Sequence, residues 1–114
     1  MNLEQFKEAI NKYTPFMHCV LEKYFSFTPN VTKTCDIEFN SARKMIYFPK
    51  YNTIKINKFG QIYSSSTEWS DSDIVSTEND EEIIKELMRI TTKVKNLKIK
   101  YKKKQMEKDF EELK

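Results

Sequence analysis

The stretch TCDIEFNSARKMIYF, residues 34–48, decides the fold class, because the spacing of apolar residues changes here from three and four to two. Cys35, Ile37 and Phe39 alternate with polar residues, which is typical of a strand that buries one face. The run RKMIYF, residues 43–48, is apolar on both faces and predicts a central strand.

Two short apolar runs that follow, NTIKIN and QIYS, predict a hairpin. The residues between them, NKFG, place Asn57 at the first position of a type I turn and Gly60 in the left-handed position after it. Gly60 is the only glycine of the chain, and glycine takes up this conformation without strain. We therefore predict an antiparallel β-meander of three or four strands over residues 32–66.

The residues before the meander carry the signals of two helices. Asn2 is a capping residue with a glutamine three positions later, as in a capping box, and apolar residues then recur at steps of three and four. Pro15 interrupts this stripe, but proline after a threonine cap commonly begins a helix. The prediction is a helical N-terminal region, residues 1–27, with a pair of helices over 3–13 and 15–25.

The residues after the meander indicate a connector and one long helix. The connector, residues 67–79, is acidic and rich in serine, and Trp69 is predicted to cover the core. Asn79 precedes a glutamate by three residues, which predicts a second capping box. Nothing interrupts a helix over residues 80–112, which at 1.5 Å per residue would be about 50 Å long. Part of that helix must project from the domain or pack on another chain.

The predicted fold is therefore α+β, with an N-terminal helical pair, an antiparallel β-meander and a long C-terminal α-helix in a single domain, residues 1–114. A chain of 114 residues can bury a core without disulfides. Cys19 and Cys35 would pair only if the fold brought them together, so we expect a reduced, cytoplasmic protein. No stretch approaches the roughly 20 apolar residues that span a bilayer, so no membrane partner is expected.

Apolar residues of the predicted C-terminal helix form two stripes on a helical wheel. The first has coiled-coil spacing and predicts a seam for a homodimer or a partner helix. Its members are Ile83, Leu87, Ile90, Val94, Leu97 and Tyr101. The second stripe lies roughly 140° away on a wheel drawn at 100° per residue, and consists of Ile84, Met88, Ile99, Met106, Phe110 and Leu113.

Basic residues occupy the side of this helix away from both apolar stripes. They are Lys85, Arg89, Lys93, Lys100, Lys103 and Lys104. Between the first and last of them Glu86 is the only acid, although acids commonly interleave with bases on a solvated helix. The stripe is either the solvated side of a buried helix or a surface for a polyanion or an acidic protein.

A second basic surface is predicted on the meander, where bases and aromatics are interleaved. Arg43, Lys44 and Tyr51 are the candidate binding residues there, because cations can contact phosphates while aromatic rings stack on bases. The alternative is that the aromatics belong to the core. The chain carries no RNP, KH or helix-turn-helix signature that would favour nucleic acid over a protein partner.

Composition and motifs argue against an enzyme. A net charge of +3 excludes the acidic composition of a DNA mimic. His18 and Cys19 are neighbours on a predicted helix and would point to different sides, which disfavours a nucleophilic or metal site. Asp36 and Glu38 share one strand face without a predicted cleft around them. We predict no catalytic residues, no metal and no cofactor.

The remaining hypothesis is a small non-enzymatic interaction protein that occludes or bridges a larger macromolecular partner. In being short, rich in lysine and isoleucine and free of motifs, the chain is similar to small accessory proteins of phages and mobile elements, including anti-CRISPR inhibitors of host defence. That similarity implies a protein partner. The alternative hypothesis is direct binding of nucleic acid through the basic helix stripe or the basic and aromatic face of the sheet.

Overall fold

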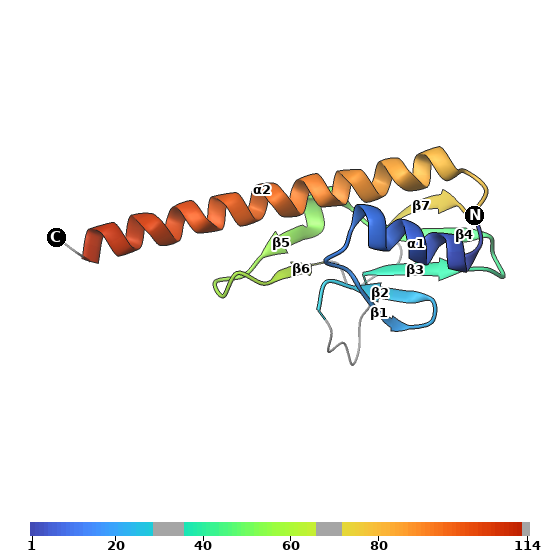
Figure 1. Ribbon diagram of the computed structural model, residues 1–114, viewed down its shortest axis with the longest axis horizontal. Coiled ribbons are helices and arrows are strands. Elements are labelled where there is room, and N and C mark those ends of the chain that lie inside the picture. Colours follow the sequence, from blue (N-terminus) through green and yellow to red (C-terminus); the bar gives the residue numbers. More distant parts are fainter. Residues whose placement is uncertain (29–35, 66–71, 113–114) are drawn as a thin grey trace.

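The computed structural model describes residues 1–28, 36–65 and 72–112, with the side chains after residue 108 left aside. It shows an α+β fold in which a five-stranded antiparallel sheet is covered by helices (Figure 1). In chain order the elements are α1 (Leu3–Tyr13), β1 (His18–Leu21), β2 (Tyr24–Ser26), β3 (Ile37–Asn40), β4 (Met45–Pro49), η1 (Tyr51–Thr53), β5 (Ile54–Ile56), β6 (Ile62–Ser64), β7 (Ser72–Ser76) and α2 (Asp80–Glu112).

The main sheet has the strand order β1-β2-β3-β4-β7, and each neighbouring pair is antiparallel. The predicted strands of the opening stretch form its centre, where Glu38 is opposite Tyr47 and Phe39 is opposite Ile46. The predicted burial of Ile37 and Phe39 is confirmed, since both are in the core. The period of two in the sequence therefore correctly identified the strand and its buried face.

The prediction of a second N-terminal helix is wrong, because residues 15–25 contribute to the β1–β2 hairpin instead. Helix α1 has the predicted capping box at Asn2 and ends at Tyr13, followed by the C-cap Thr14, whose backbone N–H donates to the Ile10 carbonyl. Pro15 follows in a turn rather than in a new helix, since Thr14 also accepts a hydrogen bond from Met17 N–H. The aromatic and β-branched residues after this turn favour strands.

The meander and the connector also need correction. Strands β5 and β6 form the predicted hairpin, with Gly60 at a φ of 82°, but they pair in a separate two-stranded sheet. The fifth strand of the main sheet is β7, which lies in the predicted connector and pairs with β4. Strand β7 buries Val75 while Ile74 stays exposed, so its apolar content was too slight to stand out. The predicted role of Trp69 lies outside the described residues.

Helix α2 has the predicted bounds and determines the shape of the molecule. It contains 33 residues, and the molecule measures 59 × 27 × 21 Å along its principal axes. Asn79 caps the helix through a 3.2 Å hydrogen bond from the backbone N–H of Glu82 to its side chain. The C-terminal part of α2 extends well beyond the strands (Figure 1), as the length of the predicted helix required.

The core lies between the sheet and the two helices. Phe6 of α1 is fully buried, and its ring contacts Phe25, Phe39 and Phe48 of the sheet at centroid distances of 5.2, 5.4 and 6.2 Å. Aromatic contacts of this kind stabilise a fold beyond the area that they bury. They fix α1 against the sheet, so its C-terminal end is held at a defined place beside α2.

Candidate binding surface on the C-terminal helix

Helix α2 leaves the body of the protein at the β5–β6 hairpin. Tyr101 donates a 3.1 Å hydrogen bond from its hydroxyl to the carbonyl of Lys58, and its ring lies over Gly60. A Cβ atom at Gly60 would be 3.0 Å from the Tyr101 ring, so any other residue would require the ring to shift. Past Tyr101 the helix projects from the body (Figure 1).

The part of α2 that approaches and passes this point is strongly basic. We call residues 93–104 the cationic arm. It contains seven lysines and no acid: Lys93, Lys95, Lys98, Lys100, Lys102, Lys103 and Lys104. Within the described part of the chain none of these lysines forms an ion pair. The arm therefore carries a dense positive charge that no ion pair among the described residues neutralises.

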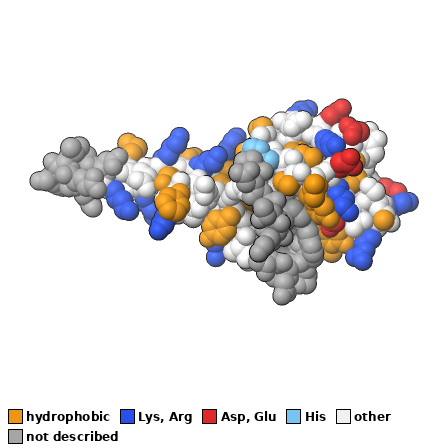
Figure 2. Space-filling model, turned by 90° about the horizontal axis from the view of Figure 1, so that it is seen from below, with side chains coloured by type: hydrophobic (Ala, Val, Ile, Leu, Met, Phe, Trp, Pro, Cys, Tyr) orange, Lys and Arg blue, Asp and Glu red, His pale blue; other side chains and the backbone are white. Residues whose placement is uncertain are grey.

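Negative charge gathers around the first turn of α2, which contains Asp80, Glu81 and Glu82. The N-terminal amine of Met1 contacts the Thr77 carbonyl and lies 3.0 Å from the Asp80 carboxylate. Lys44 lies 4.0 Å from Glu78 in the same region. Figure 2 shows basic side chains along the projecting part of the molecule, and acidic side chains intermixed with basic ones on the body. The first turn of α2, with Asp80, Glu81 and Glu82, thus differs sharply in charge from the cationic arm in the middle of the helix, and acids follow the arm again in residues 107–112.

The predicted basic stripe is only partly a free surface. Lys85, Lys100, Lys103 and Lys104 are exposed, but Arg89 Nη1 lies 3.1 Å from the buried Glu86 carboxylate. Lys93 is half-buried, and its ammonium nitrogen lies 4.6 Å from the centroid of the Tyr51 ring, a cation–π contact. Arg89 and Lys93 therefore have partners within the chain, which a helical wheel could not show.

The second predicted surface is not assembled as one site. Arg43 and Lys44 lie in the turn between β3 and β4, whereas Tyr51 follows the other end of β4. Arg43 donates a hydrogen bond to the Tyr47 hydroxyl at 3.4 Å, which raises the pKa of its guanidinium. The structure joins Tyr51 to the basic helix stripe through Lys93 instead.

The residues of the predicted seam pack within the chain. Ile83, Leu87, Ile90 and Val94 are at most 2 % exposed and belong to the core, while Leu97 and Tyr101 are partly buried. In this fold the first four are not accessible to a partner. In the second apolar stripe, three residues are exposed: Met88, Ile99 and Met106, at 55, 53 and 71 % exposure.

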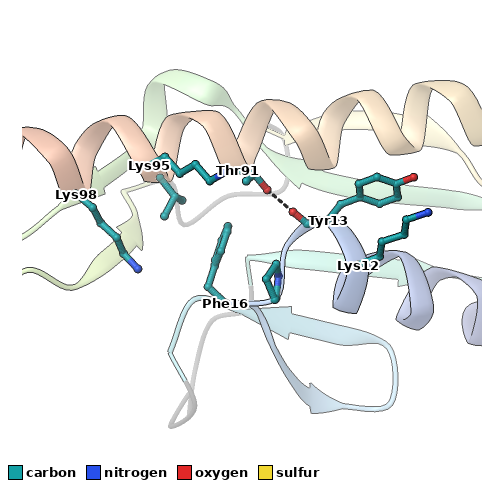
Figure 3. A pocket seen from close by; sticks show the side chains of 8 residues that line it. Lys12, Tyr13, Phe16, Thr91, Lys95 and Lys98 are labelled. Carbon is teal, nitrogen blue, oxygen red and sulfur yellow. Dashed lines mark hydrogen bonds between the residues drawn. The ribbon is translucent and has the colours of Figure 1, made fainter.

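A groove at the base of the arm was not predicted from the sequence. It has a volume of about 360 Å³ and lies between the C-terminal end of α1 and α2 (Figure 3). Its lining residues are Lys12, Tyr13, Pro15, Phe16, Thr91, Val94, Lys95 and Lys98. The Thr91 hydroxyl donates a 2.6 Å hydrogen bond to the Tyr13 carbonyl and so joins the two walls.

The lysines of this groove escaped prediction because they come from two helices far apart in the sequence. Lys95 and Lys98 lie on the flank of α2 opposite the predicted basic stripe, facing the end of α1. Lys12 joins them only because α1 ends beside α2. The only sign of a binding site in the sequence was the surplus of lysine over acid in residues 93–104. This surplus points to α2 as a binding element, but it does not reveal the groove beside α1.

No catalytic or metal site is evident in the described ranges, where no group of three potential metal-ligating side chains occurs. His18 and Cys19 are both exposed on β1, and Cys19 is a free thiol, whereas Cys35 lies outside the described residues. Burial raises the pKa of Asp36, although Ser26 and the Phe27 N–H donate hydrogen bonds that oppose the shift. That carboxylate joins the end of β2 to the residue before β3 through these two hydrogen bonds.

Burial likewise raises the pKa of Glu86, and its partner Arg89 lowers it in part. This carboxylate is enclosed on α2 and is held by an ion pair with Arg89 rather than aimed at a ligand. In the part of the chain that the structure describes, no helix is long and apolar enough to cross a membrane. The cationic arm and its groove are therefore the features that best suit binding.

Comparisons of the chain with models of protein families, with curated proteins and with solved structures gave no match. The geometry and charge of the arm are therefore the features from which a function can be inferred.

Proposed function

We propose that the protein is a non-enzymatic binding protein that holds a polyanionic macromolecule on its cationic arm. One observation carries the proposal: seven lysines within twelve consecutive residues of α2, the last three of them past the hairpin, have no acid among them and no ion pair within the described residues. A solvated helix face commonly alternates bases with acids at spacings of three and four. Within residues 93–104 no acid takes part in such an arrangement, and Glu107, three and four residues after Lys104 and Lys103, forms no ion pair with them, so the charge of the arm is available to a partner.

The spacing of the lysines explains why a partner would bind. Residues 93–104 span about 16 Å along the helix axis, while the screening length at physiological ionic strength is about 8 Å. Neighbouring ammonium groups therefore repel one another and hold a layer of counterions. A polyanion replaces those counterions and releases them, which favours association.

Nucleic acid was the alternative hypothesis from the sequence. The arm favours this partner class, because nucleic acid is a polyanion that can replace the counterions of the lysines. An acidic protein surface is the other class, and it corresponds to the predicted occluding or bridging role. An inhibitor of host defence that imitates DNA would need an acidic surface. If this protein inhibits such a system, the basic arm would act on the nucleic acid or on an acidic face of the complex.

We also propose self-association, through residues other than those of the predicted seam. The predicted seam is largely in the core, so a homodimer would use the exposed stripe that includes Met88, Ile99 and Met106. Two arms packed side by side would bring their lysines together, which costs free energy at low salt. Dimerisation is therefore expected to strengthen when a polyanion is added, and sedimentation with and without it tests this.

The main experiment measures binding of three labelled polyanions by fluorescence anisotropy: single-stranded DNA, duplex DNA and polyglutamate. The wild-type protein should bind at least one of them at low salt. The variant Lys100→Glu/Lys103→Glu changes two exposed residues and should weaken binding about tenfold or more, because a charge-assisted contact contributes about 1 kcal/mol or more. Lys93 is not suitable for this test, because it contacts Tyr51.

The matched control is Lys23→Glu/Lys44→Glu, which makes the same change of net charge on exposed residues of the body. It should leave affinity nearly unchanged, and it also tests the predicted binding role of Lys44. If both double variants lose affinity equally, total charge rather than the arm controls binding. If wild-type protein binds none of the three polyanions, the proposed function is wrong.

A further inference from the structure

We infer that the groove between α1 and α2 holds one nucleotide of a single-stranded nucleic acid, with its base on Phe16 and its phosphates on Lys12, Lys95 and Lys98. This inference rests on the proposed function and narrows it to one class of polyanion. The groove opens at the base of the cationic arm, so a strand seated in it would continue along the lysines of α2.

Phe16 has the surroundings of a stacking platform. Its ring is parallel to that of the buried Phe27, with 6.1 Å between the centroids and 12° between the planes. This contact holds the ring in one orientation, while Phe16 itself is only half-buried and lines the groove. An aromatic side chain that is fixed and partly open offers its surface to a base at little cost in side-chain entropy.

The groove contains cations and no acid among its lining residues. Lys12 comes from the last turn of α1, while Lys95 and Lys98 come from α2. Figure 3 shows Lys95 and Lys98 on α2 above Phe16, whereas Lys12 lies beside Tyr13, with its ammonium nitrogen 5.2 Å from the centroid of that ring. The Lys98 ammonium nitrogen lies 6.0 Å from the centroid of the Phe16 ring. Basic groups close to an aromatic surface are the combination that binds a phosphate and a base together.

The dimensions and the rigidity of the groove suit one nucleotide. Its volume of about 360 Å³ is at the lower end of the range for small-ligand sites, which is about 300 to 1,000 Å³. The hydrogen bond from Thr91 to the Tyr13 carbonyl joins the walls, so the groove exists before a ligand binds. A preformed site loses less conformational freedom on binding.

A single strand fits better than a duplex or an acidic peptide. Lys95, Lys98 and Lys102 share one flank of α2, at spacings of three and four, and this row leads from the groove onto the arm. A strand could place successive phosphates along that row while one base enters the groove. In a duplex the bases are stacked on each other and cannot reach Phe16, and an acidic peptide has no need of an aromatic platform.

The decisive comparison uses the unmodified protein with two labelled ligands, an oligothymidylate and an abasic strand of the same length and charge. Because stacking on an aromatic side chain adds affinity beyond the phosphates, oligothymidylate should bind about tenfold more tightly. The variant Phe16→Leu keeps an apolar side chain against Phe27 but removes the stacking ring. It should bind both ligands with the affinity of the abasic strand.

Matched lysine variants test the position of the site. Lys12→Ala/Lys95→Ala/Lys98→Ala and Lys100→Ala/Lys103→Ala/Lys104→Ala each remove three charges, from the groove and from the other flank of the arm. The groove variant should lose the preference for bases, whereas the flank variant should retain it while binding both strands more weakly. Circular dichroism of each variant confirms that its fold is retained.

Equal affinity of the wild-type protein for the two strands overturns the inference but leaves the proposed function standing. Polyglutamate bound as tightly as oligothymidylate also overturns it, and indicates an acidic protein partner. If neither strand and no other polyanion binds, the inference and the proposed function are both wrong.

Discussion

Replacing Gly60 by alanine tests how the cationic arm is anchored to the body. Gly60 has a φ of 82°, and a left-handed conformation costs an L-residue about 1 to 2 kcal/mol. The new Cβ would also be 3.0 Å from Cε1 of Tyr101 and would displace its ring. Displacement weakens the hydrogen bond from the Tyr101 hydroxyl to the Lys58 carbonyl, which contributes about 1 kcal/mol.

The two effects are partly offset, because alanine restricts the unfolded chain and so stabilises the protein by about 0.5 kcal/mol. The net loss for Gly60→Ala should be about 2 kcal/mol in the free energy of unfolding, measured by urea denaturation. A double-mutant cycle with Tyr101→Ala separates the strain from the contact. In the Tyr101→Ala background only the backbone strain remains, so the coupling free energy should be about 1 kcal/mol.

A coupling near zero would show that Tyr101 does not pack over Gly60 in solution. The hairpin would then not hold α2, and the projecting part of the helix would begin before Tyr101. A loss of stability below about 0.5 kcal/mol for Gly60→Ala would in addition contradict the left-handed turn, since the strain alone exceeds that value.

Two further substitutions test interactions within α2. Burial raises the pKa of Glu86 above its unfolded value, so the folded state binds that proton more tightly and wild-type stability falls as the pH rises through the folded pKa. Glu86→Gln should therefore gain stability relative to wild type as the pH is raised from acid to neutral, although the variant loses the ion pair with Arg89. Urea denaturation of both proteins at several pH values measures this difference. Thr91→Val removes the hydrogen bond to the Tyr13 carbonyl and should cost about 1 kcal/mol, whereas Thr92→Val at an exposed position should be nearly neutral.

The predictions from sequence were most accurate where one local pattern decides the structure. The cap at Asn2, the turn at Gly60 and the helix that begins at Asp80 depend on residues close in the chain, and each was predicted correctly. The segment after Pro15 was misassigned because its apolar spacing satisfies a helix as well as a strand. Strand β2 is stabilised by pairing with β3, and β1 in turn pairs with β2. A local sequence pattern cannot show this pairing.

The candidate site illustrates the same limit. A helical wheel located the apolar stripe of α2 that enters the core, including Ile83 and Val94, but assigned it to a partner chain. That stripe packs on α1, on the sheet and on the β5–β6 hairpin of the same molecule. The groove depends on Phe16 lying beside Lys98, and their proximity follows from tertiary packing alone.

The dependence of binding on salt tests the central claim, that the arm binds through its lysines, most directly. For a single strand the slope of log K against log salt is about −0.7 for each phosphate neutralised. If five of the seven lysines contact phosphates, the slope is about −3.5 and affinity falls about 100-fold between roughly 50 and 200 mM salt. The account predicts that slope for wild-type protein and a clearly shallower one for Lys100→Glu/Lys103→Glu. A wild-type slope near zero, or the same slope in both proteins, would contradict it.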